Sequence, residues 1–316
     1  MKTLMMLVGP SYCGKSHFAE QLKNIMPDRV RIFSSDEIRK ELYGDASCQK
    51  NPSAVFELLH ARIKQCLKEE DDVLAIYDAT NLSARRRMSF LNTIKTIACY
   101  RTCVVFPVPL STLVARQPLR YRKVSEEIIL KQIKNFRCPQ KFEGWDDIVF
   151  EFQRGDYSNQ TLIERMKEFD QKNSHHSLSL YDHCVKTANL TSVYSGNRIN
   201  ISDQNEYLNL SNIVVAAFYH DIGKLITQEF DENGEAHYRN HHNASAYMFL
   251  CLDTTKKLVK NKNLSQQDLL DITFLIQNHM EFYFRDKKGI ETLRKTVPEY
   301  LFNGLEMLHL ADLSAH

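Results

Sequence analysis

Residues 4–22 of this 316-residue chain read LMMLVGPSYCGKSHFAEQL. An apolar run, Leu4–Val8, precedes the pattern G-x-x-x-x-G-K-S, and apolar residues at helical spacing follow it. This order of buried strand, glycine-rich turn and helix is the context in which the octapeptide binds phosphate. Backbone N–H groups of the loop surround a polyphosphate, Lys15 reaches its β- and γ-phosphates, and Ser16 ligates Mg²⁺. The predicted ATP–Mg²⁺ site comprises Gly9, Pro10, Ser11, Tyr12, Cys13, Gly14, Lys15 and Ser16.

The composition, 43% hydrophobic and 25% charged, is ordinary for a soluble globular protein, and the length allows two domains. No stretch approaches the ~18 continuous apolar residues of a membrane span, and the apolar run near the N-terminus is too short for a secretory signal. We therefore expect a cytoplasmic protein with no membrane association. The eight cysteines are scattered without a C-x-x-C pair, which indicates reduced thiols.

The small net charge hides a difference between the halves. Residues 1–152 carry 24 Lys and Arg against 18 Asp and Glu, whereas residues 153–316 carry 17 against 21. A basic first half suits a polyanionic partner, and an acidic second half rich in histidine suits divalent cations.

The first half alternates strand-like and helical patterns. The strand-like runs lie at 3–8, 30–33, 73–77, 102–108 and 148–152, and the helical patterns lie near 15–26, 36–43, 53–69, 83–97 and 125–137. Such alternation predicts an α/β domain with a parallel five-stranded sheet and helices on both faces. Ligands of these sheets bind at the carboxyl ends of the strands. The residues just past those ends are therefore the candidates for a site.

Asp36 and Arg39 follow the second predicted strand. Ser34 and Glu37 allow a capping box there, in which case Asp36 only complements the helix dipole. Its place beside the phosphate loop favours a catalytic role, because a carboxylate there can accept the proton of an attacking hydroxyl. Arg39, one turn along the helix, is placed to hold a phosphate of the acceptor.

Polar residues also follow the third and fourth predicted strands. Asp78, Thr80 and Asn81 come directly after the third, and three successive arginines beyond them read either as phosphate contacts or as the solvated first turn of a helix. Past the fourth strand, Arg116 and Arg120 lie in a segment dense with guanidinium groups. A closing lid at this position would neutralise charge on a transferred phosphoryl group.

These elements together resemble the phage-type polynucleotide 5′-kinases over residues 1–152. The motifs are G-x-x-x-x-G-K-S, D-x-x-R after strand two, D-x-T-N after strand three and R-x-x-x-R in the lid. The resemblance implies that Lys15 and Ser16 bind the donor phosphates and Mg²⁺ and that Asp36 is the general base. It also implies that the acceptor is bound by Arg39, Asp78, Thr80 and Asn81. A lid over ATP is formed by Arg116 and Arg120, and Arg120 is also catalytic by this resemblance.

Residues 153–179 read as the connection to a second domain at 180–316. Helical patterns dominate that domain, near 180–193, 208–221, 241–260, 265–282 and 299–313. A hairpin is predicted at 226–239, turning on Asn233-Gly234. We expect an all-α domain after the α/β domain.

Six histidine and aspartate residues follow one another in this half, each on an otherwise apolar segment: His183, His220, Asp221, His242, His279 and Asp312. A lone helical histidine is more often a packed core residue than a ligand. Six such residues are harder to explain as core, because buried imidazoles and carboxylates need partners. A pair of metal ions supplies those partners.

The order H, H-D, H, H, D resembles the HD superfamily of metal-dependent phosphohydrolases, and the flanking H-D-I-G-K, H-x-x-S-A and A-D-L elements agree. By that resemblance, His183, His220, Asp221 and Asp312 hold one ion, and Asp221 bridges to a second ion held by His242 and His279. Two such ions activate a hydroxide and clamp the phosphate that it attacks. This mixed ligand set accepts Mn, Fe, Co, Ni or Zn. Lys224 and His176 are candidate phosphate contacts, whereas His175 and His241 read equally well as bystanders.

A kinase joined to a phosphohydrolase suggests one broken strand as their shared substrate. Many nucleases leave a 5′-hydroxyl and a 3′-phosphate or cyclic phosphate, which no ligase seals. The chain thus resembles the bifunctional bacterial end-healing enzymes, although those place the HD module first. The resemblance implies RNA or DNA ends as partners, with a separate ligase to join them.

Two other functions stay open. In one, a kinase of a nucleoside or small metabolite is fused to an HD nucleotidase. In the other, the chain is an ATP-gated signalling or binding module without turnover. The second alternative predicts loss of metal ligands, yet all six are present.

Overall fold

The computed structural model describes residues 1–119, 123–153, 157–172, 178–195 and 204–315, with side chains left out at 119 and 204–211. Contacts divide the chain into two compact units. Unit 1 comprises Met1–Gln132 and Pro139–Gln153, and unit 2 comprises Ile133–Cys138 and Arg154–His316. The chain therefore passes into unit 2, returns to unit 1 and leaves it again.

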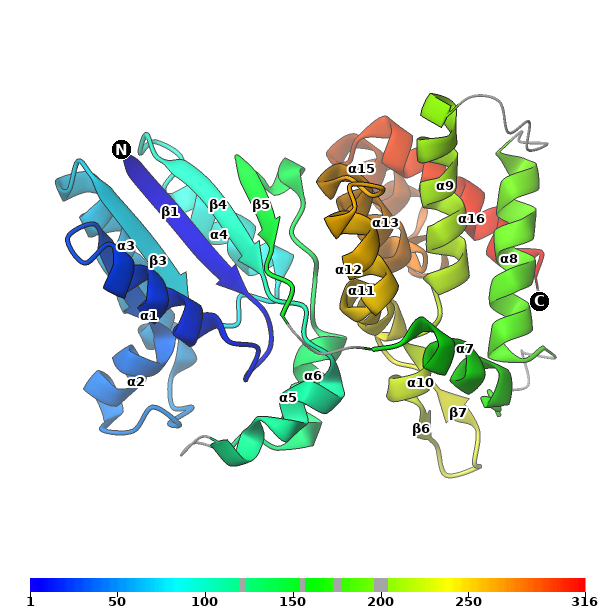
Figure 1. The fold of residues 1–316 in the computed structure, drawn as a ribbon, viewed down its shortest axis with the longest axis horizontal. Coiled ribbons are helices and arrows are strands. Elements are labelled where there is room, and N and C mark those ends of the chain that lie inside the picture. Colours follow the sequence, from blue (N-terminus) through cyan, green and yellow to red (C-terminus); the bar gives the residue numbers. More distant parts are fainter. Residues whose placement is uncertain (120–122, 154–156, 173–177, 196–203, 316) are drawn as a thin grey trace. The chain divides into compact units, whose positions relative to one another are not determined.

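Unit 1 is built on a parallel sheet of five strands in the order β2-β3-β1-β4-β5 (Figure 1). The strands are β1 Lys2–Val8, β2 Val30–Ser34, β3 Val73–Asp78, β4 Tyr100–Val105 and β5 Asp147–Phe150. All six residues of β3 are buried, as expected for a strand covered on both faces of a sheet. The predicted fold class, an α/β domain followed by a helical domain, is confirmed.

The register brings three strand ends together. Leu7 of β1 and Ser34 of β2 both pair with Asp78 at the end of β3. The residues that follow these three positions therefore share one edge of the sheet, where parallel α/β sheets bind their ligands.

The helices of unit 1 connect the strands. They are α1 Lys15–Ile25, α2 Ser35–Tyr43, α3 Pro52–Glu69, α4 Ala84–Thr93, α5 Leu110–Ala115 and α6 Glu126–Lys134, with short 3-10 turns η1 Gln117–Leu119 and η2 Lys141–Glu143. Ser34 caps α2 by accepting from the backbone N–H of Asp36, in place of the predicted box with Glu37. The helix α4 ends at Thr93, earlier than predicted.

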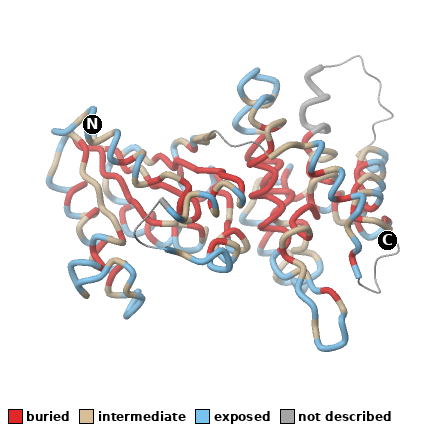
Figure 2. The backbone as a smooth tube through the Cα atoms, turned by 60° about the horizontal axis from the view of Figure 1, so that its bottom comes forward, coloured by how far each residue is buried: buried red, intermediate tan, exposed pale blue. Residues whose placement is uncertain are grey.

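Unit 2 is mainly helical. Its elements are α7 Asn159–Glu168, α8 Leu180–Tyr194, α9 Gln204–Tyr219, α10 Lys224–Thr227, α11 His241–Cys251, α12 Asp253–Lys260, α13 Gln266–Asn278, α14 Glu281–Phe284, α15 Lys287–Thr296 and α16 Glu299–Leu313, with a hairpin of β6 Glu229–Phe230 and β7 Ala236–His237. Every residue of α11 is buried, so this helix lies at the centre of the unit. Figure 2 shows buried backbone concentrated in the sheet of unit 1 and in the middle of the helices of unit 2.

The predicted helix at 241–260 is two helices. Leu252 between them has extended backbone and forms an isolated bridge with Tyr157, whose carbonyl accepts from the N–H of Asp253. The segment before α7 thus breaks the helix by offering a competing backbone partner. The same segment leads into α7, where Leu162 and Met166 are buried within unit 2.

Residues 133–138 pack into unit 2 through hydrogen bonds from α11 and α13. Asn243 donates to the carbonyl of Lys134, and Gln277 donates to that of Phe136 while its own oxygen accepts from the N–H of Cys138 at 2.9 Å. The ring of Phe136 also packs edge-on against Tyr247. These contacts satisfy buried amides of unit 2, so this short segment is part of its core.

Candidate active sites

The loop after β1 has the backbone that phosphate binding requires. Gly14, directly before α1, has φ 100°, a left-handed conformation that favours glycine. The Lys15 ammonium lies 2.9 Å from the carbonyl of Gly9 and 2.7 Å from that of Pro10. Lys15 is only 8% exposed, so the loop holds this charge in place at the start of α1.

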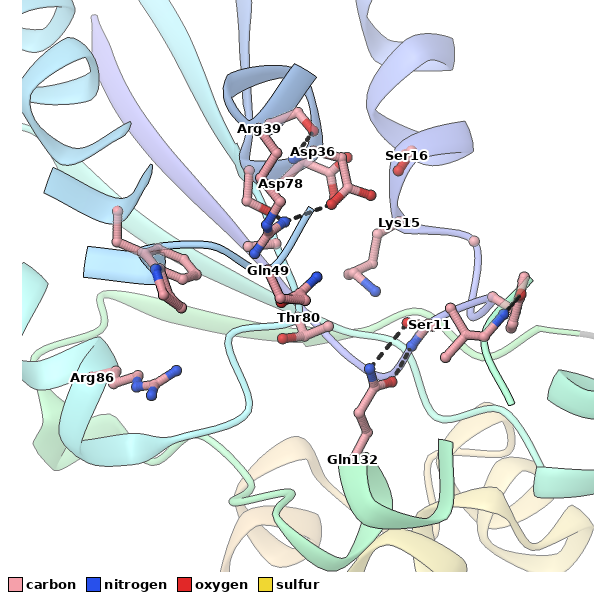
Figure 3. A pocket seen from close by; sticks show the side chains of 18 residues that line it. Ser11, Lys15, Ser16, Asp36, Arg39, Gln49, Asp78, Thr80, Arg86 and Gln132 are labelled. Atoms are coloured by element: carbon pink, nitrogen blue, oxygen red, sulfur yellow. Dashed lines mark hydrogen bonds and ion pairs between the residues drawn. The ribbon is translucent and has the colours of Figure 1, made fainter. Parts of the chain in front are cut away.

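A glutamine from α6 fixes the phosphate loop from the other side. Gln132 accepts from the N–H of Ser11 at 2.7 Å, and its amide donates to the Ser11 hydroxyl at 3.1 Å, as Figure 3 shows. Tyr12 contributes its hydroxyl, which accepts from the N–H of Val124 at 2.6 Å. No short motif marks Gln132, which is more than a hundred residues from the loop in sequence, so it is not among the predicted site residues.

A pocket of about 360 Å³ opens above the phosphate loop at the carboxyl edge of the sheet (Figure 3). Its lining includes the following residues: Ser11, Tyr12, Gly14, Lys15 and Ser16 of the loop, Ser34, Ser35, Asp36 and Arg39 after β2, Asp78 and Thr80 after β3, and Gln49, Pro52, Phe56, Arg86, Val124 and Gln132. The structure thus brings the donor loop and most of the predicted acceptor residues into one space.

Asp36 and Arg39 form an ion pair within this pocket. Arg39 Nη1 lies 2.7 Å from Asp36 Oδ1 and also donates to the Ser35 hydroxyl at 3.2 Å. The side chain of Asp36 is 48% exposed, whereas that of Arg39 is 11% exposed. The arginine is therefore held by α2, and it orients a carboxylate that faces the open pocket.

Thr80 and Asn81 support the phosphate loop through backbone contacts. The carbonyl of Thr80 accepts from the N–H of Gly9 at 3.0 Å. The Asn81 amide donates to the carbonyl of Leu7 at 2.9 Å, and its φ of 47° turns the chain away from the sheet. Asn81 does not line the pocket described above, so its contacts indicate that it positions the loop.

The predicted arginines have different environments. Arg116 donates to the carbonyl of Tyr12 and to the Gln153 side chain, which places it against the phosphate loop. Arg120 lies outside the described residues. Arg86 lines the pocket, whereas the fully buried Arg87 forms two hydrogen bonds with Glu143 and is structural.

In unit 2, four of the predicted metal ligands surround one point. His183 Nε2 and His220 Nε2 lie 3.2 Å apart, and Asp312 Oδ1 lies 3.1 Å and 3.3 Å from them. Asp221 Oδ2 lies 3.6 Å from His183 Nε2 and 3.5 Å from that of His220. Atoms about 2.1 Å from an ion and at right angles around it are about 3 Å apart, so these spacings fit a metal site.

A second group shares Asp221 through its other oxygen. Asp221 Oδ1 lies 3.0 Å from His241 Nε2 and 3.6 Å from His279 Nε2, and the two nitrogens lie 3.2 Å apart. The two oxygens of one buried carboxylate therefore face two groups of imidazoles. This arrangement supports a pair of divalent ions bridged by Asp221.

The hydrogen bonds of the ring nitrogens select the tautomer that binds metal. Nδ1 of His220, His241 and His279 each lies 2.7–2.8 Å from a backbone carbonyl, which can only accept. In the neutral imidazole, Nδ1 therefore carries the proton and Nε2 presents a lone pair. Two such lone pairs facing each other in the interior need a cation between them, which a metal ion provides.

Charge inside the cluster keeps its carboxylates ionised. Burial alone would raise the pKa of Asp221, but Lys224, His220 and His241 hold it well below its usual range. Burial opposes ionisation of Asp312 as well, and hydrogen bonds from His183 and His220 lower its pKa. Both groups are therefore in the form that binds a cation.

His241, and not His242, lies in the second group. In the described part of the chain, the groups that could hold an ion are His183–His220–Asp221 and Asp221–His241–His279. Successive residues of an α-helix point about 100° apart, so both histidines cannot face Asp221. Burial, aided by the charges of His241 and His279, lowers the pKa of His242 to about 2. We propose His241 in place of the predicted His242.

The two predicted phosphate contacts differ in outcome. Lys224 is buried, with its ammonium 2.7 Å from Asp221 Oδ2 and 3.1 Å from the Gln171 side chain. It also lines a pocket of about 880 Å³ that lies over the second metal group. His176 lies outside the described residues.

We expect His241→Ala to lower the metal content of the purified protein from about two ions per chain to about one, because it removes a ligand of the second group. His242→Ala, the matched control at the neighbouring position, should keep about two. Elemental analysis after dialysis measures both, with melting temperatures to confirm folding. Loss of metal from the His242 variant alone would restore the ligand set predicted from the sequence.

The geometry defines a P-loop kinase domain followed by an HD phosphohydrolase domain. Residues 4–139 match the family model of an AAA domain, and residues 180–298 match that of an HD domain. The two parts of the chain are thus similar to different families. None of its described helices is long and apolar enough to span a membrane.

Comparison with solved structures gives similarities over about half of this chain. One is to a chain of the Pnkp1/Rnl/Hen1 RNA repair complex, at 24% identity and a TM-score of 0.38, covering 42% of this chain and 43% of that one. A fungal RNA kinase has 14% identity and a TM-score of 0.38, and the match covers 49% of this chain and 77% of the kinase chain. A gluconokinase from Sinorhizobium meliloti 1021 has 14% identity and a TM-score of 0.33, and the match covers 48% of this chain and 82% of the gluconokinase chain.

The similar structures include both an RNA kinase and a gluconokinase. The chain matches less than half the length of the repair-complex chains. A comparison with curated proteins found no match.

Proposed function

We propose that this protein heals broken nucleic-acid ends: unit 1 phosphorylates a 5′-hydroxyl with ATP, and unit 2 removes a 3′-terminal or 2′,3′-cyclic phosphate. The observation that carries the proposal is the pair Asp36–Arg39 in the pocket above the phosphate loop. This pair, with Asp78 and Thr80, belongs to the motifs that carry the resemblance to polynucleotide kinases.

In unit 1, Lys15 and the loop amides bind the donor phosphates, and Ser16 is placed to ligate Mg²⁺. Asp36 accepts the proton of the attacking hydroxyl as the phosphoryl group is transferred. Arg39 holds the Asp36 carboxylate in position, and on its exposed side it is placed to meet a phosphate of the acceptor. Arg86, across the pocket, supplies a further cation for the acceptor strand (Figure 3).

In unit 2, His183, His220, Asp221 and Asp312 would hold one divalent ion, and Asp221, His241 and His279 would hold the other. When bound, such a pair activates water and neutralises the phosphate. Lys224 stays beside the bridging Asp221 and balances its charge. The Tyr283 hydroxyl donates to Asp312 Oδ2 at 2.9 Å and so fixes the orientation of that ligand.

The two activities together would leave a 5′-phosphate and a 3′-hydroxyl, the ends that a ligase joins. We therefore propose a separate nucleic-acid ligase as a functional partner. The Pnkp1 comparison structure is itself a complex with Rnl and Hen1.

The substrate test offers labelled ATP to unit 1 with equal amounts of a 5′-hydroxyl oligoribonucleotide, an oligodeoxyribonucleotide, nucleosides and sugars. We expect label in an oligonucleotide and little in the small molecules. Label that enters only a nucleoside or sugar would replace the proposed acceptor with a metabolite. No transfer to any acceptor while ATP still binds would favour a module without turnover.

A further inference from the structure

The pocket over the metal groups of unit 2 is larger than a phosphate needs. Its volume is about 880 Å³, which is in the range of pockets that enclose whole drug-sized ligands. Part of its lining is the second metal group and Asp312, and the rest of the lining bounds space that a phosphate alone would leave empty. The substrate must therefore carry a sizeable group next to the ester.

Two walls with different chemistry bound that space. One follows the hairpin of β6 and β7 (Figure 1) and presents His237, Tyr238, Arg239 and Asn240. The other is α14 with the residue that precedes it, and it presents Met280, Tyr283 and Phe284. One wall thus offers polar and cationic groups, and the other offers aromatic and apolar ones.

Phe284 stands out on the aromatic wall. It is 73% exposed, whereas the neighbouring Phe282 and Tyr283 both pack on the ring of His309. Among the described ring contacts none involves Phe284, and it belongs to the pocket lining, so its phenyl ring is accessible to a ligand there. Open aromatic faces at nucleic-acid sites act as platforms on which bases stack.

A hydrogen bond ties the segment that carries this phenyl to the metal groups. Tyr283, the residue before Phe284, is hydrogen-bonded through its hydroxyl to the predicted ligand Asp312. Arg239 on the opposite wall is exposed and lines the same pocket. An arginine in the lining of this pocket suits the next phosphodiester of a strand, because phosphate contacts fix the position of nucleic acids.

From these contacts we infer that this pocket is a nucleoside subsite: Phe284 stacks on the base of the terminal nucleotide, and Arg239 binds the phosphodiester on its 5′ side. The assumption that the substrate is a strand end rests on the proposed function of unit 2. Base stacking by Phe284 does not depend on that function. Phe284 and Arg239 are specificity residues that touch the substrate away from the reacting phosphate.

The test compares Phe284→Ala with the wild-type protein on two substrates, an oligoribonucleotide with a 3′-phosphate and glycerol phosphate. One stacked base is worth roughly a 10- to 100-fold change, so kcat/KM for the oligonucleotide should fall by about that factor while glycerol phosphate hydrolysis is unchanged. Phe284→Trp should retain activity on both. Phe230→Ala is the matched control, since Phe230 is another exposed phenyl in unit 2 that does not line this pocket.

Binding gives a readout that does not need turnover. The Kd of the same oligonucleotide, and of a nucleoside monophosphate, measured in chelator, should rise in Phe284→Ala and not in Phe230→Ala. Arg239→Ala should weaken binding of the oligonucleotide. It should leave binding of the mononucleotide unchanged, because the mononucleotide lacks the second phosphate.

The outcomes separate this inference from the proposed function. Equal effects of Phe284→Ala on glycerol phosphate and on the oligonucleotide, or unchanged binding and turnover of both nucleotide ligands, would overturn the subsite. If the wild-type protein leaves the strand end intact but hydrolyses and binds mononucleotides in a Phe284-dependent way, the subsite stands and end healing by unit 2 fails.

Discussion

Replacing both His220 and Asp221 by Ala is expected to strip unit 2 of its metal ions and to abolish its phosphate hydrolysis. Both residues are buried, and Asp221 is the residue that the two imidazole groups of the described chain share, so its loss affects both groups. Phosphorylation of a 5′-hydroxyl should continue, because the phosphate loop and Asp36 belong to unit 1. Elemental analysis and paired assays of the two reactions measure these results.

The exposed pair His237 and Asp231 provides a matched control for metal content. These residues have the same types and approach within 3.3 Å, but they belong to neither metal group. Their double Ala variant should keep both ions. Retained hydrolysis in the His220/Asp221 variant would show that the clusters are not the catalytic site.

We expect Asp36→Asn to lower phosphate transfer by about 10²-fold or more. The amide keeps the shape of the side chain but cannot take the proton of the attacking hydroxyl. The cap of α2 is supplied by Ser34, and Lys15 is held by loop carbonyls, so both the helix and ATP binding should persist. The measurements are kcat for transfer and the Kd of ATP.

Glu37→Gln is the matched control for Asp36→Asn. Glu37 is the next acidic residue in the first turn of α2 and is exposed, but it does not line the pocket. The Glu37→Gln variant should transfer phosphate at the normal rate. If Asp36→Asn also turned over normally, Asp36 would only complement the helix dipole.

Local pattern was enough to predict the sheet and the phosphate loop. Each strand of unit 1 lies within a few residues of its predicted run, since buried apolar runs and glycine turns are coded by neighbouring residues. The approach of Gln132 to Ser11 was not predictable in this way, because it depends on where α6 packs in three dimensions.

The choice between His241 and His242 shows the same limit on a smaller scale. Both lie in the first turn of the same apolar helix, α11, and only the helical phase decides which one faces Asp221. That phase is set by the turn at Asn240, which has φ 60°, and by the bond between His241 Nδ1 and the carbonyl of Tyr238. The motif fixed the type of ligand, and the turn fixed its position.

The assignment of residues 133–138 to unit 2 also depends on distant contacts. Nothing in this short segment predicts that Gln277 and Asn243 bind its backbone, because those residues follow more than a hundred positions later. A helical pattern continuous through 125–137 concealed the point at which the chain passes between the units.

The most direct measurement uses one oligoribonucleotide with a 5′-hydroxyl and a 2′,3′-cyclic phosphate, incubated with the metal-loaded protein and ATP. End healing predicts a product with a 5′-phosphate and a 3′-hydroxyl. Asp36→Asn should block only the addition of the 5′-phosphate, and the His220/Asp221 double variant should block only the removal of the cyclic phosphate. The end-healing function would be contradicted if both ends of the oligonucleotide stayed unchanged while free nucleotides gained or lost phosphate.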